Sequence, residues 1–311
     1  MPSRWHINDR PQSLTAFLRR FPDDAACASY LHEKRWPDGF VCPACGACKG
    51  WELSSKRWTW ECGECGRQTS VTAGTVMHRS KVSLRTWFLA AHIMATHSNG
   101  MSALQMQAHL GLGSYKTAWL LLHKLRRAMV NPERDLLVGD VEVDETTLPY
   151  RTKRDPVGGG QGRSTIGKMV VVGAVELLEG NAPGRIRLET VPDYSGSTLK
   201  GFIRDVVEPR SEIWTDGNES YAGMTGYSHH PRVIGNMAAH ILMPWIHRVF
   251  SNLKRWAMGT YHGLRKKHIA SYLDEFVFRW NRRRWRQVAF DKLLGLSVRI
   301  PPMGYRELVE G

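Results

Sequence analysis

The chain has 311 residues, of which 42% are hydrophobic and 23% charged, a composition typical of a globular protein with two or three domains. Lysine and arginine number 43 against 29 aspartate and glutamate, so the formal net charge of +14 favours a partner with dense negative charge, such as nucleic acid. No apolar run reaches the roughly 18 residues that a membrane helix needs, and the first ten residues lack the apolar core of a signal peptide. We therefore expect an intracellular protein with no membrane partner, in which disulfides are disfavoured.

The N-terminal part of the sequence predicts a helical segment followed by a zinc-binding module. Residues 1–38 carry apolar side chains at helical spacing. Residues 39–77 contain two CxxC units sixteen residues apart, the pattern of a zinc ribbon in which four thiolates hold a structural Zn²⁺ ion: Cys42, Cys45, Cys62 and Cys65. Cys48 is an alternative ligand with a poorer spacing, and Cys27 lies on an apolar helical face, where we interpret it as a core thiol.

Residues 78–132 predict a second helical region. Within it, residues 102–113 indicate a helix that ends at a glycine turn, and residues 114–127 indicate another helix. This order is typical of a helix-turn-helix, whose second helix can lie in the major groove of DNA, with Lys116 near its exposed start. An ordinary helical hairpin has the same pattern, but the net charge and the neighbouring zinc module favour DNA.

Residues 136–290 predict an α/β domain. The expected elements are β-type runs at 138–147, 168–178, 185–191 and 212–215, a helix at 197–207 before the last run, and later helices at about 240–259 and 267–286. This order matches the ribonuclease-H-like fold, a mixed sheet with flanking helices. We expect residues 291–311 to form a C-terminal tail.

Two aspartates in this domain are candidate ligands for a divalent metal. Residues 141–146 (VEVDET) place Glu142 and Asp144 on one face of an otherwise apolar strand and Glu145 on the other. A carboxylate in such a strand needs a cation or hydrogen bonds to compensate for its burial. Asp216 closes a second short strand before a glycine. Oxygen ligands favour Mg²⁺ or Mn²⁺, and two such ions would activate an attacking oxygen and stabilise the leaving 3′ oxygen of a phosphodiester.

Several motifs in one order carry a resemblance to a known family. They are the four-cysteine ribbon, residues 141–146 (VEVDET), residues 214–221 (WTDGNESY), and a C-terminal block with residues 247–256 (HRVFSNLKRW) and 272–283 (YLDEFVFRWNRR). From about residue 15 to residue 290, the chain resembles the DDE-type insertion-sequence transposases of the ISXO2-like group. The resemblance implies a transposase of the bacterial cytoplasm, associated with the nucleoid, with Asp144 and Asp216 as its first two metal ligands.

The third metal ligand is where the chain departs from that family. Many relatives have glutamate where this chain has His247, so the resemblance implies a set of Asp144, Asp216 and His247. Imidazole favours Mn²⁺ somewhat more than an oxygen-only site does. Helical spacing places His247 and Lys254 on one face, where Lys254 could contact the scissile phosphate, and Asn252 is a further catalytic candidate. A helix-capping or partner-bonding histidine is the alternative for His247.

Basic residues outside the acidic site are candidate DNA contacts. Residues 282–286 (RRRWR) combine arginine with tryptophan, which suits phosphate contact and stacking, although a solvated helix face is the usual reason for a charge run. The candidate DNA-binding residues are Lys116, Arg126, Arg127, Lys153, Arg154, Arg255, Lys266, Lys267, Arg282, Arg283, Arg284 and Arg286.

The expected function is a transposase that binds the ends of an insertion sequence and catalyses metal-dependent cleavage and strand transfer of double-stranded DNA. We expect a homodimer or higher oligomer on DNA, with one structural Zn²⁺ and two catalytic Mg²⁺ or Mn²⁺ ions. Glu275, on a later helix, is an alternative third acid. Two other functions stay open: a nuclease of the same fold without strand transfer, and a catalytically inactive zinc-ribbon DNA-binding regulator, which the histidine in place of glutamate favours.

Overall fold

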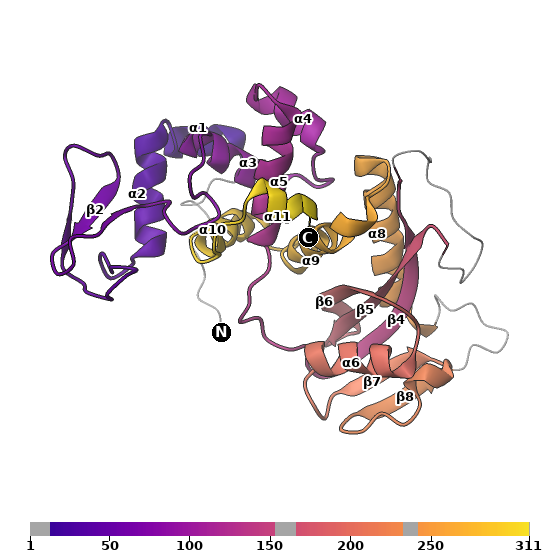
Figure 1. The fold of residues 1–311 in the computed structure, drawn as a ribbon. Helices are drawn as coiled ribbons and strands as arrows, with labels where there is room; N and C mark the ends of the chain where they lie inside the picture. Colours follow the sequence, from indigo (N-terminus) through magenta and orange to yellow (C-terminus); the bar gives the residue numbers. More distant parts are fainter. Residues whose placement is uncertain (1–12, 153–165, 233–241, 311) are drawn as a thin grey trace. The chain divides into compact units, whose positions relative to one another are not determined.

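The computed structural model describes residues 13–152, 166–232 and 242–310 of the chain (Figure 1). These residues divide into two compact units. Unit 1 consists of Met1–Asn131 together with Arg284–Gly311, and unit 2 consists of Pro132–Arg283. The candidate DNA contacts Lys153 and Arg154 lie outside the described residues.

Unit 1 is helical apart from a small three-stranded sheet. Its described elements are α1 (Leu14–Arg20), α2 (Asp24–Arg35), β1 (Gly50–Glu52), β2 (Thr59–Cys62), β3 (Gln68–Ser70), α3 (Leu84–Thr96), α4 (Ala103–Leu110), α5 (Tyr115–Arg127), α10 (Arg286–Ser297) and α11 (Tyr305–Glu310). A serine or aspartate side chain caps each of the first five helices by accepting a bond from a backbone amide of the first turn. These local signals explain why the helices begin where they do.

The expected helix, glycine turn and second helix are present. Helix α4 carries a capping box formed by Ser102 and Gln105 and ends at Gly111, whose φ of 60° is the left-handed conformation that glycine adopts without strain. Ser114 then caps α5. At the start of α5, Tyr115 and Lys116 are exposed, and the Lys116 ammonium lies 3.9 Å from the centre of the Tyr305 ring.

A cluster of aromatic rings forms the centre of the helical part of unit 1. The rings of Phe17, Phe21, Tyr30, Phe88 and Phe290 have centroids between 4.9 and 6.4 Å apart where they contact. Such pairs add about 0.5–1.5 kcal/mol each to the stabilisation that burial provides. Phe290 belongs to α10, so a segment from near the end of the sequence completes a core that begins near residue 14.

The prediction of a C-terminal tail at residues 291–311, after a catalytic domain that ends at 290, is wrong. Helix α10 lies in unit 1 and buries Phe290, Leu293 and Leu294. Asp291 on the same helix accepts a hydrogen bond from Tyr30 and pairs with Lys34 at 2.8 Å. The physical reason is the apolar face of α10, which packs into the core of unit 1. The predicted helix over 267–286 ended before this face, whereas in the structure one helix ends at Asn281 and α10 begins at Arg286.

Unit 2 is a five-stranded mixed sheet covered by helices. Its elements are β4 (Asp140–Pro149), β5 (Lys168–Leu178), β6 (Ala182–Val191), α6 (Gly196–Val206), β7 (Glu212–Asp216), η2 (Glu219–Tyr221), β8 (Ser228–Arg232), α8 (Pro244–Tyr261), η3 (Lys266–His268) and α9 (Ile269–Asn281). The strand order is β6-β5-β4-β7-β8, with β4, β5 and β6 antiparallel and β4, β7 and β8 parallel. This arrangement confirms the predicted mixed α/β fold of the ribonuclease-H-like class.

The two faces of this sheet carry separate cores. Helix α6 packs on one face, where Val141 and Val143 of β4 are fully buried with Leu199 and Ile203. Helices α8 and α9 pack on the other face, over Val171 and its neighbours. Gly173, the partner of Asp144 across the β4–β5 pair, lets α8 approach closely, because a Cβ at this position would come within 2.8 Å of Phe250. The first turns of α8 therefore lie close to the acidic residues of β4.

Candidate active site and metal centres

The four cysteines of the two CxxC units come together in unit 1. Their sulfurs are 3.5 Å (Cys45–Cys65), 3.6 Å (Cys45–Cys62) and 3.7 Å (Cys42–Cys65) apart. A tetrahedral zinc with Zn–S bonds of about 2.3 Å places its sulfurs roughly 3.8 Å apart, whereas a disulfide needs about 2.05 Å. The donor set therefore fits a structural Zn²⁺ ion, as the spacing predicts.

Local backbone structure positions each half of this cluster. Gly46 and Gly66 follow the second cysteine of each unit with φ of 76° and 67°, and their amides donate to the carbonyls of Cys42 and Cys62 at 2.9 and 3.0 Å. The backbone amide of Ala44 also donates to the Cys42 sulfur at 3.5 Å, a contact that favours the thiolate that zinc requires. The two turns are thus near copies of one another.

The other two cysteines lie outside this set. Cys48 is exposed and is not among the four sulfurs that gather, so the structure does not support it as a ligand. Cys27 is completely buried in α2, and burial raises the pKa of its thiol to about 12. This agrees with the interpretation of Cys27 as a core residue.

In unit 2, Asp144 and Asp216 lie on neighbouring parallel strands. The β4–β7 register pairs Asp140 with Glu212 and Glu142 with Trp214, so that continuing it by two residues brings Asp144 opposite Asp216. Asp144 is 7% exposed, and its Oδ1 accepts a hydrogen bond of 2.8 Å from the Glu145 amide. The alternation of β4 and the topology of the sheet thus bring both predicted aspartates to one place.

Glu145, which was not predicted as a site residue, lies together with these aspartates. Asp144, Glu145 and Asp216 each offer a carboxylate oxygen, and these oxygens all lie within 4.8 Å of one another. Strand alternation correctly places Glu145 on the face opposite Asp144, but here it lies beyond the last β4–β7 pair, where the chain after β7 can reach it. Asn218 donates to its Oε1 at 3.0 Å and the Tyr221 hydroxyl donates to its Oε2 at 2.7 Å. The only sequence signal for the position of Glu145 was that it directly follows Asp144.

His247 lies beside Asp144, in the first turn of α8. Its Nε2 is 3.7 Å from the Asp144 Oδ2, and its side chain is 28% exposed. The buried Glu142 accepts hydrogen bonds from the amides of Trp245 and Ile246 at 3.0 and 2.8 Å, so this carboxylate caps the helix that carries His247. Burial raises the pKa of Glu142, while the two amides and Arg232 act against that rise.

Lys254 also lies within electrostatic reach of the acidic residues. Partial burial and then the charge of Lys168 lower its pKa, whereas Asp144 raises it. Lys254 is therefore a cation on the α8 face near Asp144, in agreement with the helical spacing from His247. Asn252, on the same helix, is half-buried, and its catalytic role stays a prediction.

The alternative acid, Glu275, has a structural environment. It is completely buried in α9, pairs with Arg279 at 3.1 Å, and accepts hydrogen bonds from the Tyr261 hydroxyl at 3.2 and 3.3 Å. The carboxylate set that includes Asp144 and Asp216 does not include Glu275. This environment favours a role in holding α9 together.

The candidate DNA-binding residues differ in exposure. Arg126 is only 1% exposed, so its prediction as a DNA contact is wrong; it lies on the buried side of α5. Arg282 and Arg283 are half-buried: Arg282 donates to the Phe278 carbonyl, and Arg283 donates to the carbonyls of Pro183 and Gly184. Arg127 is half-buried as well. The exposed candidates are Lys116, Arg255, Lys266, Lys267, Arg284 and Arg286.

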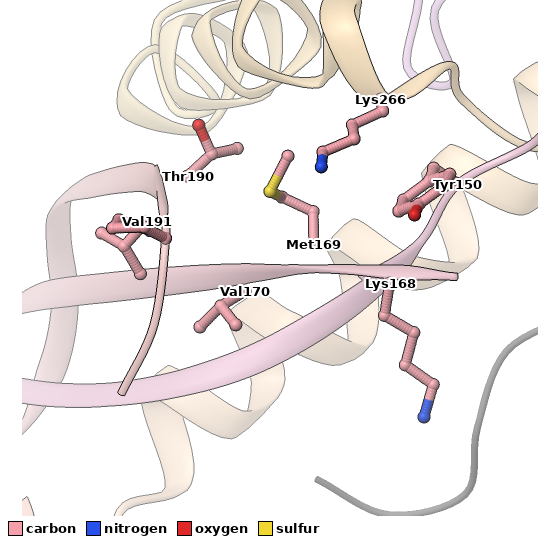
Figure 2. A pocket seen from close by; sticks show the side chains of 8 residues that line it. Tyr150, Lys168, Met169, Val170, Thr190, Val191 and Lys266 are labelled. Carbon is pink, nitrogen blue, oxygen red and sulfur yellow. The ribbon is translucent and has the colours of Figure 1, made fainter. Parts of the chain in front are cut away.

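A cavity of about 440 Å³ opens at the start of β5 in unit 2. Its lining includes Tyr150, Lys168, Met169, Thr190 and Lys266. Figure 2 shows Met169 and Lys266 pointing into the space beside Tyr150, whereas Lys168 points away from them. Two of its lining residues, Lys168 and Lys266, are basic.

Comparisons with known proteins find two domain matches in this chain. Residues 136–281 match the family model described as the ISXO2-like transposase domain, and residues 22–68 match the transposase zinc-ribbon domain. A protein of Halobacterium salinarum, described as an uncharacterized protein in transposable element ISH50, is 26% identical over 278 residues, covering 84% of this chain and 92% of the relative. None of the helices in the described parts of the chain has both the length and the apolar character of a membrane span.

The matched regions coincide with the structural features described above. The first model covers the sheet with Asp144 and Asp216, and the second covers all four clustered cysteines. Two transposase domains therefore occur in the order that the motifs predict, and residues 136–281 of the chain are similar to the ISXO2-like transposase domain.

Proposed function

We propose that this transposase binds the ends of its insertion sequence, cuts the DNA there and joins the freed 3′ ends to target DNA. The observation that carries the proposal is the meeting of Asp144, within β4, and Asp216, at the end of the neighbouring strand β7, with carboxylate oxygens within 4.8 Å. Two ionised carboxylates at this distance repel each other unless a cation lies between them, so the donor set suits Mg²⁺ or Mn²⁺.

The residues around this pair have separate roles in the proposal. Asp144 and Asp216 would hold divalent ions, which would supply Lewis-acid activation of the attacking oxygen and stabilisation of the leaving oxygen. His247 is the third ligand that we propose, because its Nε2 lies 3.7 Å from the Asp144 carboxylate. Lys254 contacts the scissile phosphate as a point charge. Asn252 assists from the same helix.

DNA ends bind to the zinc ribbon, to the start of α5 and to exposed basic residues of both units. Lys116, Arg255 and Lys266 are exposed, and so are Lys267, Arg284 and Arg286. Such contacts neutralise phosphates and make binding weaken as salt rises. We propose a dimer or higher oligomer, since joining two ends requires two active sites, and action on chromosomal DNA in the cytoplasm.

The test is strand transfer by the zinc-loaded full-length protein, with a pre-cut duplex that ends in the inverted repeat flanking its gene. Wild type should join this end to plasmid DNA in Mg²⁺ or Mn²⁺, and Asp144→Ala should lose joining but retain end binding. Hydrolysis without joining would instead identify a nuclease. End binding without cutting or joining, equal in wild type and Asp144→Ala, would identify a regulator.

The same assay tests the third ligand. His247→Ala should reduce joining strongly, and His247→Glu should restore part of it in Mg²⁺, because an oxygen ligand suits that ion better than imidazole. If His247→Ala is as active as wild type, His247 is not the third ligand.

A further inference from the structure

Strand β4 places three acidic residues close together: Glu142, Asp144 and Glu145. Asp144 belongs to the proposed metal site, but the two glutamates have other partners. Each accepts hydrogen bonds from a segment that carries or directly follows a different residue of the site. The glutamates therefore connect Asp144 to the rest of the site through protein contacts.

Glu145 is bonded to the segment that follows Asp216. Its two oxygens accept from the Asn218 side chain and the Tyr221 hydroxyl, and Tyr221 is completely buried. Asn218 also donates its backbone amide to Asp216 Oδ1 at 3.1 Å. Asn218 thus contacts both Glu145 and Asp216. Any shift of the chain after β7 relative to β4 would break these bonds and change the Asp144–Asp216 separation.

Glu142 has the equivalent relation to α8. The N-cap residue of this helix, Met243, makes no side-chain capping bond, and Pro244 follows it. The first free amides, those of Trp245 and Ile246, donate to Glu142 Oε2 instead. His247 is the next residue, so this cap determines how far the imidazole stands from Asp144.

We propose that Glu142 and Glu145 are positioning residues that fix His247 and Asp216, respectively, relative to Asp144. This inference rests on the proposed function, because it concerns the same metal site. Partners that orient metal ligands commonly change metal affinity or activity 10- to 100-fold when they are removed. The competing role for Glu145 is that of a metal ligand, but its two oxygens already accept hydrogen bonds. Loss of the bond from Tyr221 would leave the hydroxyl of a buried tyrosine without this acceptor.

A double-mutant cycle between Glu145 and Tyr221 tests the first half. Mn²⁺ binding to the zinc-loaded full-length protein is measured by electron paramagnetic resonance, and strand transfer gives kcat and KM. Tyr221→Phe and Glu145→Ala should each weaken Mn²⁺ binding and lower kcat by about 10-fold, with KM for DNA unchanged. The double variant should lose little more than Glu145→Ala alone, because the hydrogen bond that Tyr221→Phe removes is already absent in Glu145→Ala.

Tyr261→Phe is the matched control. It also removes a tyrosine hydroxyl that donates to a buried glutamate of unit 2, namely Glu275, which lies outside the site. This variant should lose some thermal stability but keep Mn²⁺ affinity and kcat. If Tyr261→Phe and Tyr221→Phe lower Mn²⁺ affinity equally, the effect is merely structural and the inference fails.

Other outcomes separate the competing roles. Glu145 would be a metal ligand if Glu145→Gln lowered Mn²⁺ affinity more than 100-fold while Tyr221→Phe kept the Mn²⁺ affinity of the wild type. That result would overturn the inference. Wild-type Mn²⁺ affinity in Asp144→Asn would overturn the proposed metal site itself. The two failures are therefore distinguishable.

The second half is tested through His247. Glu142→Gln keeps one acceptor oxygen for the α8 amides and should retain most of kcat, whereas Glu142→Ala should lower it about 10-fold. The double variant Glu142→Ala/His247→Ala should have the same kcat as His247→Ala alone, because the helix cap acts through the histidine. Full additivity of the two substitutions would overturn the role of Glu142.

Discussion

The four-cysteine cluster and the acidic cluster differ in how their ligands are brought together. In the ribbon, each pair of sulfurs comes from one four-residue turn, and the sulfur separations already match those around zinc. In unit 2, Asp144 and Asp216 come from two strands that are distant in sequence, and Glu145 and His247 approach from other sides. A closed set of four thiolates stabilises a fold, whereas carboxylates at a strand end leave positions for substrate oxygens.

The largest expected effect is the loss of zinc from the ribbon. Cys45→Ala removes one of four ligands, and structural zinc contributes on the order of 10 kcal/mol to small metal-binding modules. The module should unfold locally, with changed fluorescence of Trp36 and Trp60, which pack around the buried cysteines. Zinc content is measured with a chromogenic chelator after denaturation.

Cys48→Ser is the matched control for this experiment, because Cys48 is exposed and outside the set. It should bind zinc as wild type does. Both variants should keep the Mn²⁺ affinity of unit 2. A fall in zinc content of Cys48→Ser would show that the set of four ligands is incorrectly assigned.

The second effect concerns catalysis alone. Asp144→Asn should lower strand transfer on the order of 10³-fold or more, about 4 kcal/mol in activation free energy, since it removes a metal ligand. Its thermal stability should stay near that of wild type or rise, because a carboxylate leaves a crowded acidic cluster. Zinc content should not change. A loss of zinc in this variant would contradict the independence of the two metal sites.

Acid should destabilise unit 1 through a group outside both clusters. Burial, and then the charge of His97, lower the pKa of His92 to about 4, whereas an unfolded histidine titrates near 6.5. The unfolded state therefore binds more protons between these values, and stability falls as the pH falls from 6.5 toward 4, by about 2–3 kcal/mol. His92→Leu should reduce this fall, as measured by urea unfolding at pH 7 and pH 5. An identical pH dependence in the variant would exclude His92 as the cause.

The smallest expected effect is at Lys254. Lys254→Gln should lower kcat for strand transfer by about 10-fold, which corresponds to about 1.4 kcal/mol, if the ammonium contacts the scissile phosphate. Mn²⁺ affinity in the absence of DNA should rise or stay unchanged, since a neighbouring cation is removed. Met258→Gln, one helical turn further along α8, is the control and should behave as wild type. Equal activity of both variants would remove Lys254 from the site.

Sequence patterns predicted the parts of the molecule that depend on local spacing. The two CxxC units, the capped helices around Gly111 and the apolar strand with Asp144 all follow from rules that act within a few residues. Asp216 required the order of strands as well. Each of these predictions concerns an element whose conformation its own residues largely determine.

The missed features depend on contacts between distant segments. Glu145 joins the acidic cluster because Asn218 and Tyr221 reach it from the chain after β7, which alternation along β4 cannot indicate. Arg126 is only 1% exposed, and the residues of α5 alone do not indicate this burial. The role of α10 depends on aromatic residues near the start of the chain. No pattern within one element contains this information.

The return of α10 to unit 1 also has a consequence for synthesis on the ribosome. Unit 2 is an insertion between two parts of unit 1, so the ring cluster of Phe17 and Phe21 lacks Phe290 until the whole of unit 2 has been translated. Unit 2 consists of one continuous segment and can fold as soon as it emerges. The nascent chain thus completes its five-stranded sheet before it completes the aromatic core of unit 1, and a ribosome that stops early leaves unit 1 exposed to proteolysis.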